Sequence, residues 1–578
     1  MKSKLRPIHV LKRRPRRPAP GRLRRGSVLI VVLVVILLLT YGVYGFTERM
    51  LAEARAAEAH GRAVQATAFA ESGIEYAASY VAARAADPAA PMSLYHEPGQ
   101  FGGVLVHESA AATAIGRFSL VAPVAGDTSY RQLRYGMSDE SGKLNINAIA
   151  AMGLDEFQQQ TLLMALPGMT EEIAEAILDY LDEDDETRLL GAESEYYETL
   201  APPYPAKNGP LESIDELLLV RGVTPELLYG EDTNRNGLLD PAENDGAASL
   251  PVDDADGVLR PGWHSFVTIY SRESNASTSG EPKLDINQAL LTELYDAIME
   301  AMDDELAAQF IVAYRLAGPT DPDQSAPTAT ETSSGTNATN GTDATNGDDS
   351  DTRPSQQQQL DDAAKKIGQA MGGAPQGSVT RAGMDLSKGA KFEIGSLYDL
   401  IDRQVEVEIE GSLQTITSPF TLADILEAMP ELNDRFALSE STAVEGRINV
   451  NEAPYEVLVG LPNMTPHIAQ AIVAGRVDGS GQPFSESPDR RTTAWLVAQD
   501  IVDLPTLRKL DRYLTARGDV FKVQSVGFFD GGGAFARIEA VIDGSVTPAK
   551  VMSYRDITDL GRGYAPSQLL PAAGQTAP

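Results

Sequence analysis

The residues with the clearest capacity for chemistry lie in a twelve-residue loop at 232–243. Oxygen donors recur along it at the spacing of EF-hand ligands: Asp232, Asn234, Asn236, the Leu238 carbonyl, Asp240 and Glu243. Gly237 stands at the position where such a loop turns sharply. Calcium takes six to eight oxygens around one centre, so this spacing predicts a structural calcium ion. A metal-free turn rich in Asn, Asp and Gly is the alternative.

A second acidic stretch has no such regular spacing. The acids at 182–186 together with Glu193 could hold another ion, but we interpret them as a solvated acidic face. Elsewhere the sequence has no nucleophile elbow, phosphate-binding loop or histidine pair at zinc-binding spacing. The chain has no cysteine, which excludes thiolate chemistry and disulfides. We therefore expect no enzyme activity.

Charge is divided unevenly along the 578 residues. Of 48 basic residues, eleven lie in residues 1–26, a segment without acids. The other 37 basic residues face 82 acidic ones, so the body of the protein carries a net charge of −45. Such a body repels nucleic-acid phosphates, whose neutralisation supplies much of the affinity of nucleic-acid-binding proteins. The length alone predicts about three or four domains.

An apolar stretch follows the basic segment. Residues 27–46 would span about 30 Å as a helix, which matches a bilayer core. The basic residues before it predict that residues 1–26 stay in the cytoplasm. An alanine-rich helical pattern then continues to residue 86. A plain signal anchor and a cleaved secretory signal are two interpretations. The third is a pilin-like leader, which the sequence around Gly26 and Ser27 resembles, with cleavage between these two residues.

Internal repeats organise the body. A five-residue pattern that begins with a basic residue and ends with Asn occurs at 143–147, 283–287 and 447–451, and the last Asn is expected to cap a helix. Related turns at 166–170 and 461–465 end with a threonine expected to cap a second helix. Helix–hairpin–helix units are predicted. Such units often bind DNA, but here the acidic surroundings favour a packing role.

Strand-like segments flank the helical part: 103–107, 116–122, 131–137, 520–528, 534–542 and 551–554. They predict an α+β fold in which a long N-terminal transmembrane helix packs on a pilin-like antiparallel sheet. A large, mainly α insertion with helix–hairpin–helix-like units interrupts that sheet. Within the insertion, residues 320–389 are of low complexity and predict a disordered polar linker.

The predicted parts are assigned by residue range. They are a basic leader 1–26, a transmembrane part 27–46, the rest of the helix 47–90, a sheet from 91–138 and 518–557, helical insertion parts 139–319 and 390–517 separated by the linker 320–389, and a flexible tail 558–578.

Several motifs together resemble the minor pseudopilin K family of the type II secretion system. They are segment 70–75 of the helix, followed by 139–147, 179–197, 210–217 and 220–227 in that family's order. Val31 stands where most pilin-like proteins carry a glutamate, and a subunit without that carboxylate resembles this family. The long polar linker and the lack of cysteine depart from the family pattern.

The resemblance implies a non-catalytic subunit at the tip of a secretion pseudopilus, which supports protein export across the outer membrane. It implies processing by a prepilin peptidase, methylation, and a single-pass position in the inner membrane with most of the chain in the periplasm. The implied partners are the I- and J-type minor pseudopilins, the major pseudopilin and the inner-membrane secretion platform. A minor pilin of a type IV pilus and a membrane-anchored protein for DNA binding or uptake are the alternatives.

Overall fold

The computed structural model describes residues 25–86, 93–127, 129–320, 379–476 and 487–571. Contacts divide the chain into two units, Met1–Gln65 and Ala66–Pro578. Residues 1–24 of the predicted leader and residues 321–378 of the predicted linker lie outside the described residues.

Helix α1, Arg25–Ala86, begins in the first unit and ends in the second. Its side chains from Val28 to Leu39 are all apolar and exposed. Within the described ranges, α1 is the one helix long and apolar enough to cross a membrane, with a mean hydropathy of 2.7 in its most apolar window. Alanines, which have the highest helix propensity, continue the helix beyond that window. The predicted long N-terminal helix is confirmed.

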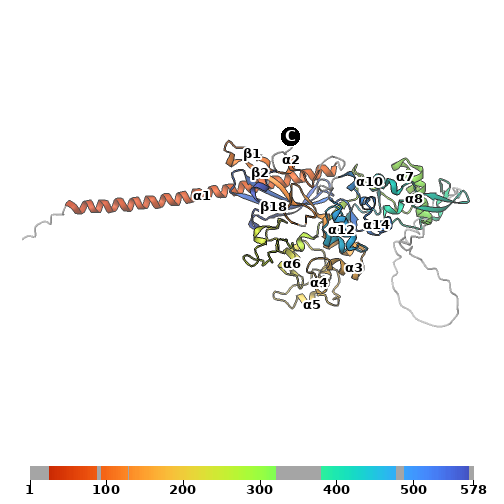
Figure 1. Cartoon of the computed structure of the whole chain (residues 1–578), viewed down its shortest axis with the longest axis horizontal. Helices are drawn as coiled ribbons and strands as arrows, with labels where there is room; N and C mark the ends of the chain where they lie inside the picture. The colour runs from red at the N-terminus through yellow and green to blue at the C-terminus, as the bar shows by residue number, and fades with distance from the viewer. Residues whose placement is uncertain (1–24, 87–92, 128, 321–378, 477–486, 572–578) are drawn as a thin grey trace, which may run out of the picture. The chain divides into compact units, whose positions relative to one another are not determined.

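A seven-stranded antiparallel sheet lies in the second unit (Figure 1). Its order is β1–β2–β17–β18–β19, with β3 beside β2 and β4 beside β17. The bounds are β1 Val104–His107, β2 Gly116–Pro123, β3 Leu133–Arg134, β4 Ser138–Asp139, β17 Val520–Phe529, β18 Phe535–Asp543 and β19 Lys550–Asp556. The α+β class and the strands predicted on both sides of the insertion are confirmed.

The end of α1 packs on this sheet. From Ala66 to Val81 its buried side chains join a core cluster with Phe118, Val523 and Val526 of the strands. Glycines permit the close approach: a methyl group at Gly73 would overlap Ser525 Oγ and lie 2.9 Å from the Phe118 ring, and one at Gly527 would lie 2.5 Å from the Ala70 amide. The helix therefore lies directly on the backbone of β17.

The insertion leaves the sheet after β4 and returns at β17, and these two strands pair. Asp139 lies opposite Phe521, and Ser138 lies opposite Lys522. Asp139 is buried, accepts hydrogen bonds from the Ser141 amide and the Asn449 side chain, and lies near Glu452. Burial and the nearby Glu452 carboxylate raise the pKa of Asp139.

The three sequence repeats form three equivalent structures. Each begins with a two-residue strand that pairs in parallel with a strand at the end of the same repeat. The pairs are β5 Leu144–Asn145 with β6 Val267–Thr268, β8 Leu284–Asp285 with β13 Phe436–Ala437, and β15 Ile448–Asn449 with β16 Leu514–Thr515. A repeat is thus a loop of chain closed by its own first and last residues.

The predicted cap at the last Asn of each repeat motif is wrong. The preceding polar residue takes that role: Asn145, Asp285 and Asn449 accept from the amide two residues later. The last Asn instead bonds to distant backbone, because its side chain points across the repeat. Its partners are Leu211 for Asn147, Ile394 for Asn287, and Arg490 with Ala516 for Asn451.

Short helices fill the repeats. They are α3 Glu156–Met164, α4 Glu171–Leu181, α5 Ser194–Tyr197, α6 Pro225–Tyr229, α7 Leu291–Met302, α8 Glu305–Ala317, α10 Ile425–Arg435, α11 Tyr455–Val459, α12 Pro466–Ala474, α13 Trp495–Ala498 and α14 Leu504–Leu510. Thr170 caps α4 and Thr465 caps α12, as predicted. Another helix, α2 Pro98–Phe101, precedes β1. Strands β7 Arg272–Ser274 and β14 Ala443–Glu445 pair between repeats.

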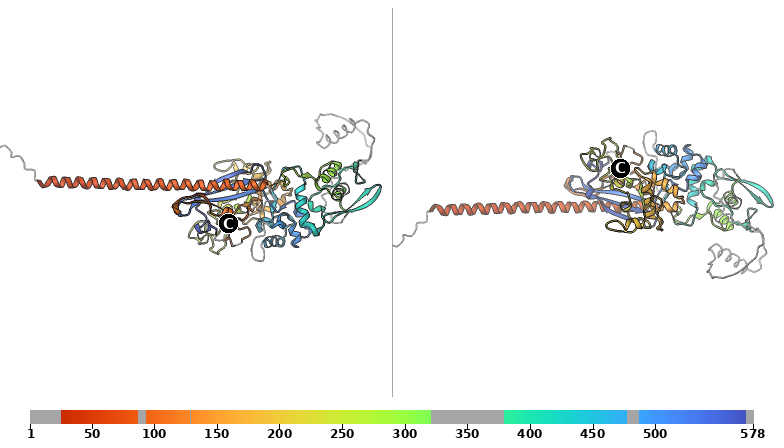
Figure 2. Two further views of the ribbon diagram at one scale, coloured as in Figure 1. Left: turned by 90° about the horizontal axis from the view of Figure 1, so that it is seen from above. Right: turned by 90° about the horizontal axis from the view of Figure 1, so that it is seen from below.

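A four-stranded antiparallel sheet, not anticipated from the sequence, lies in the second repeat. Its order is β12–β11–β10–β9. The bounds are β9 Thr380–Arg381, β10 Met384–Asp385, β11 Gln404–Ile409 and β12 Ser412–Thr417. In Figure 2 the β11–β12 hairpin, in cyan, extends away from the helices around it.

Two predictions of disorder need correction. Residues 379–389, assigned to the linker, are ordered, because Met384 and Leu386 are buried in the core of the repeat. The tail predicted at 558–578 is ordered to Pro571, because Tyr564 and Leu569 are buried against the sheet. The Leu569 carbonyl accepts from Ser119 Oγ at 2.5 Å. Residues 572–578 lie outside the described part of the chain.

Replacing Gly73 by alanine should destabilise the protein by about 1–3 kcal/mol, because the added methyl group overlaps Ser525 and Phe118. The matched control is Gly61→Ala in the same helix, where no atom lies within 4 Å of the new methyl group. Alanine there should be neutral or stabilise the helix by up to about 1 kcal/mol. Fluorescence of the two buried tryptophans, Trp263 and Trp495, reports unfolding of the full-length chain in detergent. Equal midpoints for the two variants would contradict the close packing.

Candidate functional site

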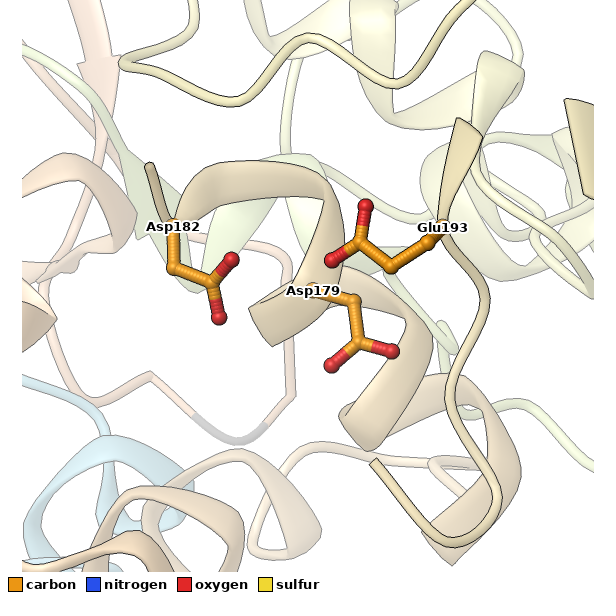
Figure 3. A group of neighbouring side chains, drawn as sticks. All are labelled: Asp179, Asp182 and Glu193. Atoms are coloured by element: carbon orange, nitrogen blue, oxygen red, sulfur yellow. The ribbon is translucent and has the colours of Figure 1, made fainter. Parts of the chain in front are cut away.

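Three carboxyl groups converge in the first repeat. Asp179 lies in the last turn of α4, Asp182 is its C-cap residue, and Glu193 precedes α5. Oxygen atoms from the three groups all lie within 4.8 Å of one another. Asp179 is fully buried, Glu193 is 3% exposed, and the Asp182 side chain is about one quarter exposed. In Figure 3 Asp182 and Glu193 turn their carboxylates towards the space between them, with Asp179 beside it.

Arg188 pairs with two of the three acidic side chains of this cluster. Arg188 Nη1 lies 2.6 Å from both Asp179 Oδ1 and Asp182 Oδ2. Neither Glu193 oxygen has a hydrogen-bond partner of normal geometry. Burial, then the charges of Asp179 and Asp182, raise the pKa of Glu193 to about 7, and the nearby Ser194 amide offsets only part of that rise. The cluster is therefore short of positive charge.

The interpretation of this stretch as a solvated acidic face is wrong for Glu193, because its side chain is buried beside the buried Asp179. It holds for residues 183–186, which are exposed. A buried, unpaired carboxylate is costly, and a bound cation removes that cost. Three convergent carboxylates, one with both oxygens unpaired, provide the donor set of a calcium site that would be completed by water or carbonyl oxygens. The residues present therefore fit a calcium ion.

The other two repeats use arginine where the first does not. In each repeat we compare the residue eleven positions after the N-cap of α4, α8 or α12. This residue is Leu181 in the first repeat, Arg315 in the second and Arg476 in the third. Arg315 donates to the carbonyls of Asn287 and Gln288 at 2.6 and 3.0 Å. Arg476 donates to Val450 and Ala453. In each case a buried cation holds the start of the repeat. Among the described residues, three acidic side chains converge in the first repeat only.

The predicted calcium loop 232–243 folds tightly. Its oxygen-bearing residues Asp232, Asn236 and Glu243 are all buried. Arg235 and Gly237 adopt left-handed backbone conformations, with φ of 57° and 67°, so the loop curls at the expected glycine. Asp232 accepts from the amides of Asn236 and Gly237 at 3.0 and 2.9 Å.

The remaining ligands of the loop bond to one another. Asp240 accepts from the side-chain amides of Asn234 and Asn236 at 2.7 and 2.9 Å. Glu243 accepts from the Thr233 and Asp240 amides, both at 3.1 Å. Burial, followed by the charges of Asp232 and Asp240, raises the pKa of Glu243 to about 7. The asparagine side chains turn their nitrogens towards Asp240, and their oxygens accept from the Asn236 and Leu238 amides at 3.0 and 2.7 Å. A calcium ion in this loop would therefore require both side-chain amides to rotate.

The sheet holds this loop through residues that sequence reasoning missed. Arg537 of β18 is fully buried and donates to the Asn234 and Arg235 carbonyls at 2.6 and 2.7 Å. Gln524 of β17 donates to the Arg235 carbonyl at 2.8 Å. Leu238 is buried in the core of the sheet. The arginine within strand 535–543 was the available signal, but the loop that it binds lies about 300 residues away in the chain.

The other predicted positions lie in the first unit. Gly26 and Ser27 are in the first turn of α1, and their side chains are outside the described set. Val31 is 61% exposed on the apolar part of α1.

One of the six histidines, His264, lies beside the loop 232–243. Its Nε2 is 3.7 Å from Asp232 Oδ2.

Comparison with known proteins matches the part of the chain that holds the acidic cluster. The model of the family described as type II secretion system (T2SS), protein K, matches residues 142–229. A curated protein of Escherichia coli strain K12, named for type II secretion system protein K, is 33% identical over 113 residues. That match covers 18% of this chain and 33% of the relative, so the chain spans about a third of the relative's length.

A solved structure is also similar. It is one chain of the GspK–GspI–GspJ complex from the type 2 secretion system of enterotoxigenic Escherichia coli. The alignment covers 87% of this chain and 99% of that chain at 12% identity, with a TM-score of 0.34.

Calcium should raise the unfolding temperature of the full-length chain in detergent, because a ligand that binds only the folded state adds about 2.7 kcal/mol at a hundredfold excess over its dissociation constant. Glu193→Gln and Glu243→Gln should each remove part of that rise, since each removes one anionic ligand. In chelator, Glu193→Gln should be at least as stable as the wild type, because it removes an unpaired buried carboxylate.

The matched control is Glu186→Gln, which changes an exposed acid of the same segment and should leave the calcium response intact. A wild-type unfolding curve that does not change between chelator and millimolar calcium would contradict both sites. A full calcium response in Glu193→Gln would contradict calcium binding at the acidic cluster and would leave the loop 232–243 as the remaining site.

Proposed function

We propose that this protein, whose residues 142–229 match the family model of type II secretion system protein K, is a non-catalytic minor pseudopilin. The observation that carries the proposal is the combination of that match with α1. Helix α1 is apolar at its start and continues without a break to its end, which packs on the antiparallel sheet. The segment that matches protein K lies between β4 and β17 of that sheet. A protein so built can assemble laterally through its membrane helix and carry the insertion outside the membrane.

A position at the tip of the pseudopilus follows from two features. Val31 provides no carboxylate to pair with the N-terminal amine of a subunit above. The lack of that carboxylate has no energetic cost at a position that has no such neighbour. The insertion between β4 and β17 adds three repeats to one end of the sheet, a mass that would obstruct a further subunit. The proposed neighbours are the I- and J-type minor pseudopilins, with the major pseudopilin below them.

Calcium is the proposed cofactor, and its role is structural. The acidic cluster would hold α4 to the segment before α5, and the loop 232–243 would hold the first repeat to the sheet. Residues of the chain supply the oxygens, and the ion would offset their repulsion. The repeats contain helix pairs joined by short turns, which we interpret as helix–hairpin–helix-like packing units within an acidic body. The proposed location is the inner membrane, with residues beyond α1's apolar part in the periplasm.

Co-expression with I- and J-type minor pseudopilins tests the proposal. The chain has no cysteine, so Ala52→Cys and Ala59→Cys introduce unique crosslinking sites on exposed positions of α1. We expect the three proteins to co-purify and the two variants to crosslink only to subunits beside or below them. The cysteine-free wild type is the control, since it forms no disulfide crosslink. Crosslinks to the major pseudopilin on both the upper and lower sides would contradict a tip position.

Processing is a separate expectation. A prepilin peptidase should cleave after Gly26 and leave Ser27 as the N-terminus, because the basic segment ends there and an apolar helix begins. Intact-mass measurement of membrane-extracted protein, produced with and without the peptidase, tests this. Replacing Gly26 by a bulky residue should leave the leader attached. A leader retained in the presence of the peptidase, or cleavage beyond residue 46, would contradict the pilin-like processing.

A further inference from the structure

The β11–β12 hairpin presents an unprotected strand edge. Its two strands pair in register over six residue pairs without a shift. Glu410 and Gly411 form the two-residue turn with φ of 49° and 80°, the backbone typical of a type I′ hairpin. Val405, Val407 and Ile409 bury one face of β11 in the core of the repeat. The core therefore holds the hairpin rigidly through β11, while β12 lies at the edge of its sheet.

Three residues of β12 offer backbone groups to a partner. The residues flanking a two-residue turn form a hydrogen-bonded pair, and such pairs alternate along an antiparallel ladder. Leu413, Thr415 and Thr417 therefore point their N–H and C=O groups away from β11. Apart from the β11 pairing, none of the three makes a backbone hydrogen bond to another described residue. All three are exposed, and Leu413 is 71% exposed.

The two end strands of the seven-stranded sheet are protected. Strand β1 has a register shift between Leu105 and His107. Strand β19 is paired through another shift and carries Lys550, Arg555 and Asp556. Bulges and charges are the common means of preventing unwanted strand pairing. Strand β12, with the sequence Ser-Leu-Gln-Thr-Ile-Thr, has no charge, no proline and no bulge. Its edge is therefore open to strand addition.

Charge indicates the kind of strand that fits. Glu406 and Glu408 lie opposite Thr415 and Leu413, so they share the solvent face of the hairpin with those residues. Lys388 lies 3.7 Å from Glu408, but both side chains are more than half exposed, and such a pair contributes little. A strand added beside β12 would lie roughly 10 Å from β11, a distance that an extended Lys or Arg side chain and a Glu side chain can bridge together.

We propose that β12 binds an extended segment of another protein by antiparallel or parallel strand addition, and that this segment alternates basic with apolar or β-branched side chains. Backbone hydrogen bonds supply affinity in this mode, and alternate side chains supply specificity. A second copy of this chain is disfavoured as the occupant, because each chain carries a net charge of −34 and each hairpin face is acidic.

The test measures binding of a fluorescent capped peptide of about seven residues, with Lys alternating with Val and Thr, to the full-length chain in detergent. Thr415→Pro removes one outward N–H at an edge position where proline is tolerated, and should weaken binding about tenfold. Thr415→Val keeps that N–H and is the matched control. Glu406→Gln combined with Glu408→Gln should weaken binding at low salt and have less effect at high salt.

A second measurement does not depend on the folding of a variant. The same peptide, N-methylated on amides of both edges, should lose binding to the wild type, and a peptide with Glu in place of Lys should bind at least about tenfold more weakly. Equal binding of the Lys and Glu peptides, or of Thr415→Pro and Thr415→Val, would overturn the proposal. Self-association of the wild type that Thr415→Pro abolishes would also overturn it, because a second copy would then be the occupant.

Discussion

The pairing of β4 with β17 is the constraint on which the arrangement of the second unit depends. The two strands are separated by about 380 residues of chain, yet Asp139 lies opposite Phe521. The whole insertion must therefore begin and end at one place on the sheet. Asp139 helps to fix that place, because it also bonds to Asn449 at the start of the third repeat. Its raised pKa shows that a carboxylate at this junction is tolerated at a cost in charge repulsion and desolvation.

The repeats solve the same closure problem on a smaller scale. Each is a long excursion of chain closed by two-residue parallel strands, which on their own are too short to be stable. Buried polar contacts provide the missing stability. The last Asn of each motif bonds to backbone across the repeat, and Arg315 and Arg476 hold backbone carbonyls in the second and third repeats. In the first repeat a cluster of carboxylates, short of positive charge, lies near the equivalent helix end instead.

The loop 232–243 connects the first repeat to the sheet. The loop 232–243 belongs to the first repeat, but Arg537 and Gln524 of the sheet bind its carbonyls. Any ion that stiffens the loop would thus also strengthen the contact between insertion and sheet. The C-terminal segment shares that contact, since Tyr564 Oη donates to Gln524 Oε1 at 2.8 Å. This reinforcement would suit the proposed role at the tip of a pseudopilus.

The sequence by itself determined the local features. An apolar run without charges can only be a buried or membrane helix, so α1 was predictable, as were the strands 116–122 and 520–528 and the threonine caps of α4 and α12. The EF-hand spacing also identified a loop that curls at Gly237. Tertiary structure alone decided which polar residue of each repeat motif caps, because the partners of the last Asn lie 39 to 151 residues away. It also decided that Asp179 and Glu193 are buried together, that Arg537 reaches the loop, and that residues 379–389 and 558–571 are ordered. The physical reason is common to all of these: burial and long-range hydrogen bonds depend on what packs against a residue, and that information is not contained in the composition or spacing of its neighbours.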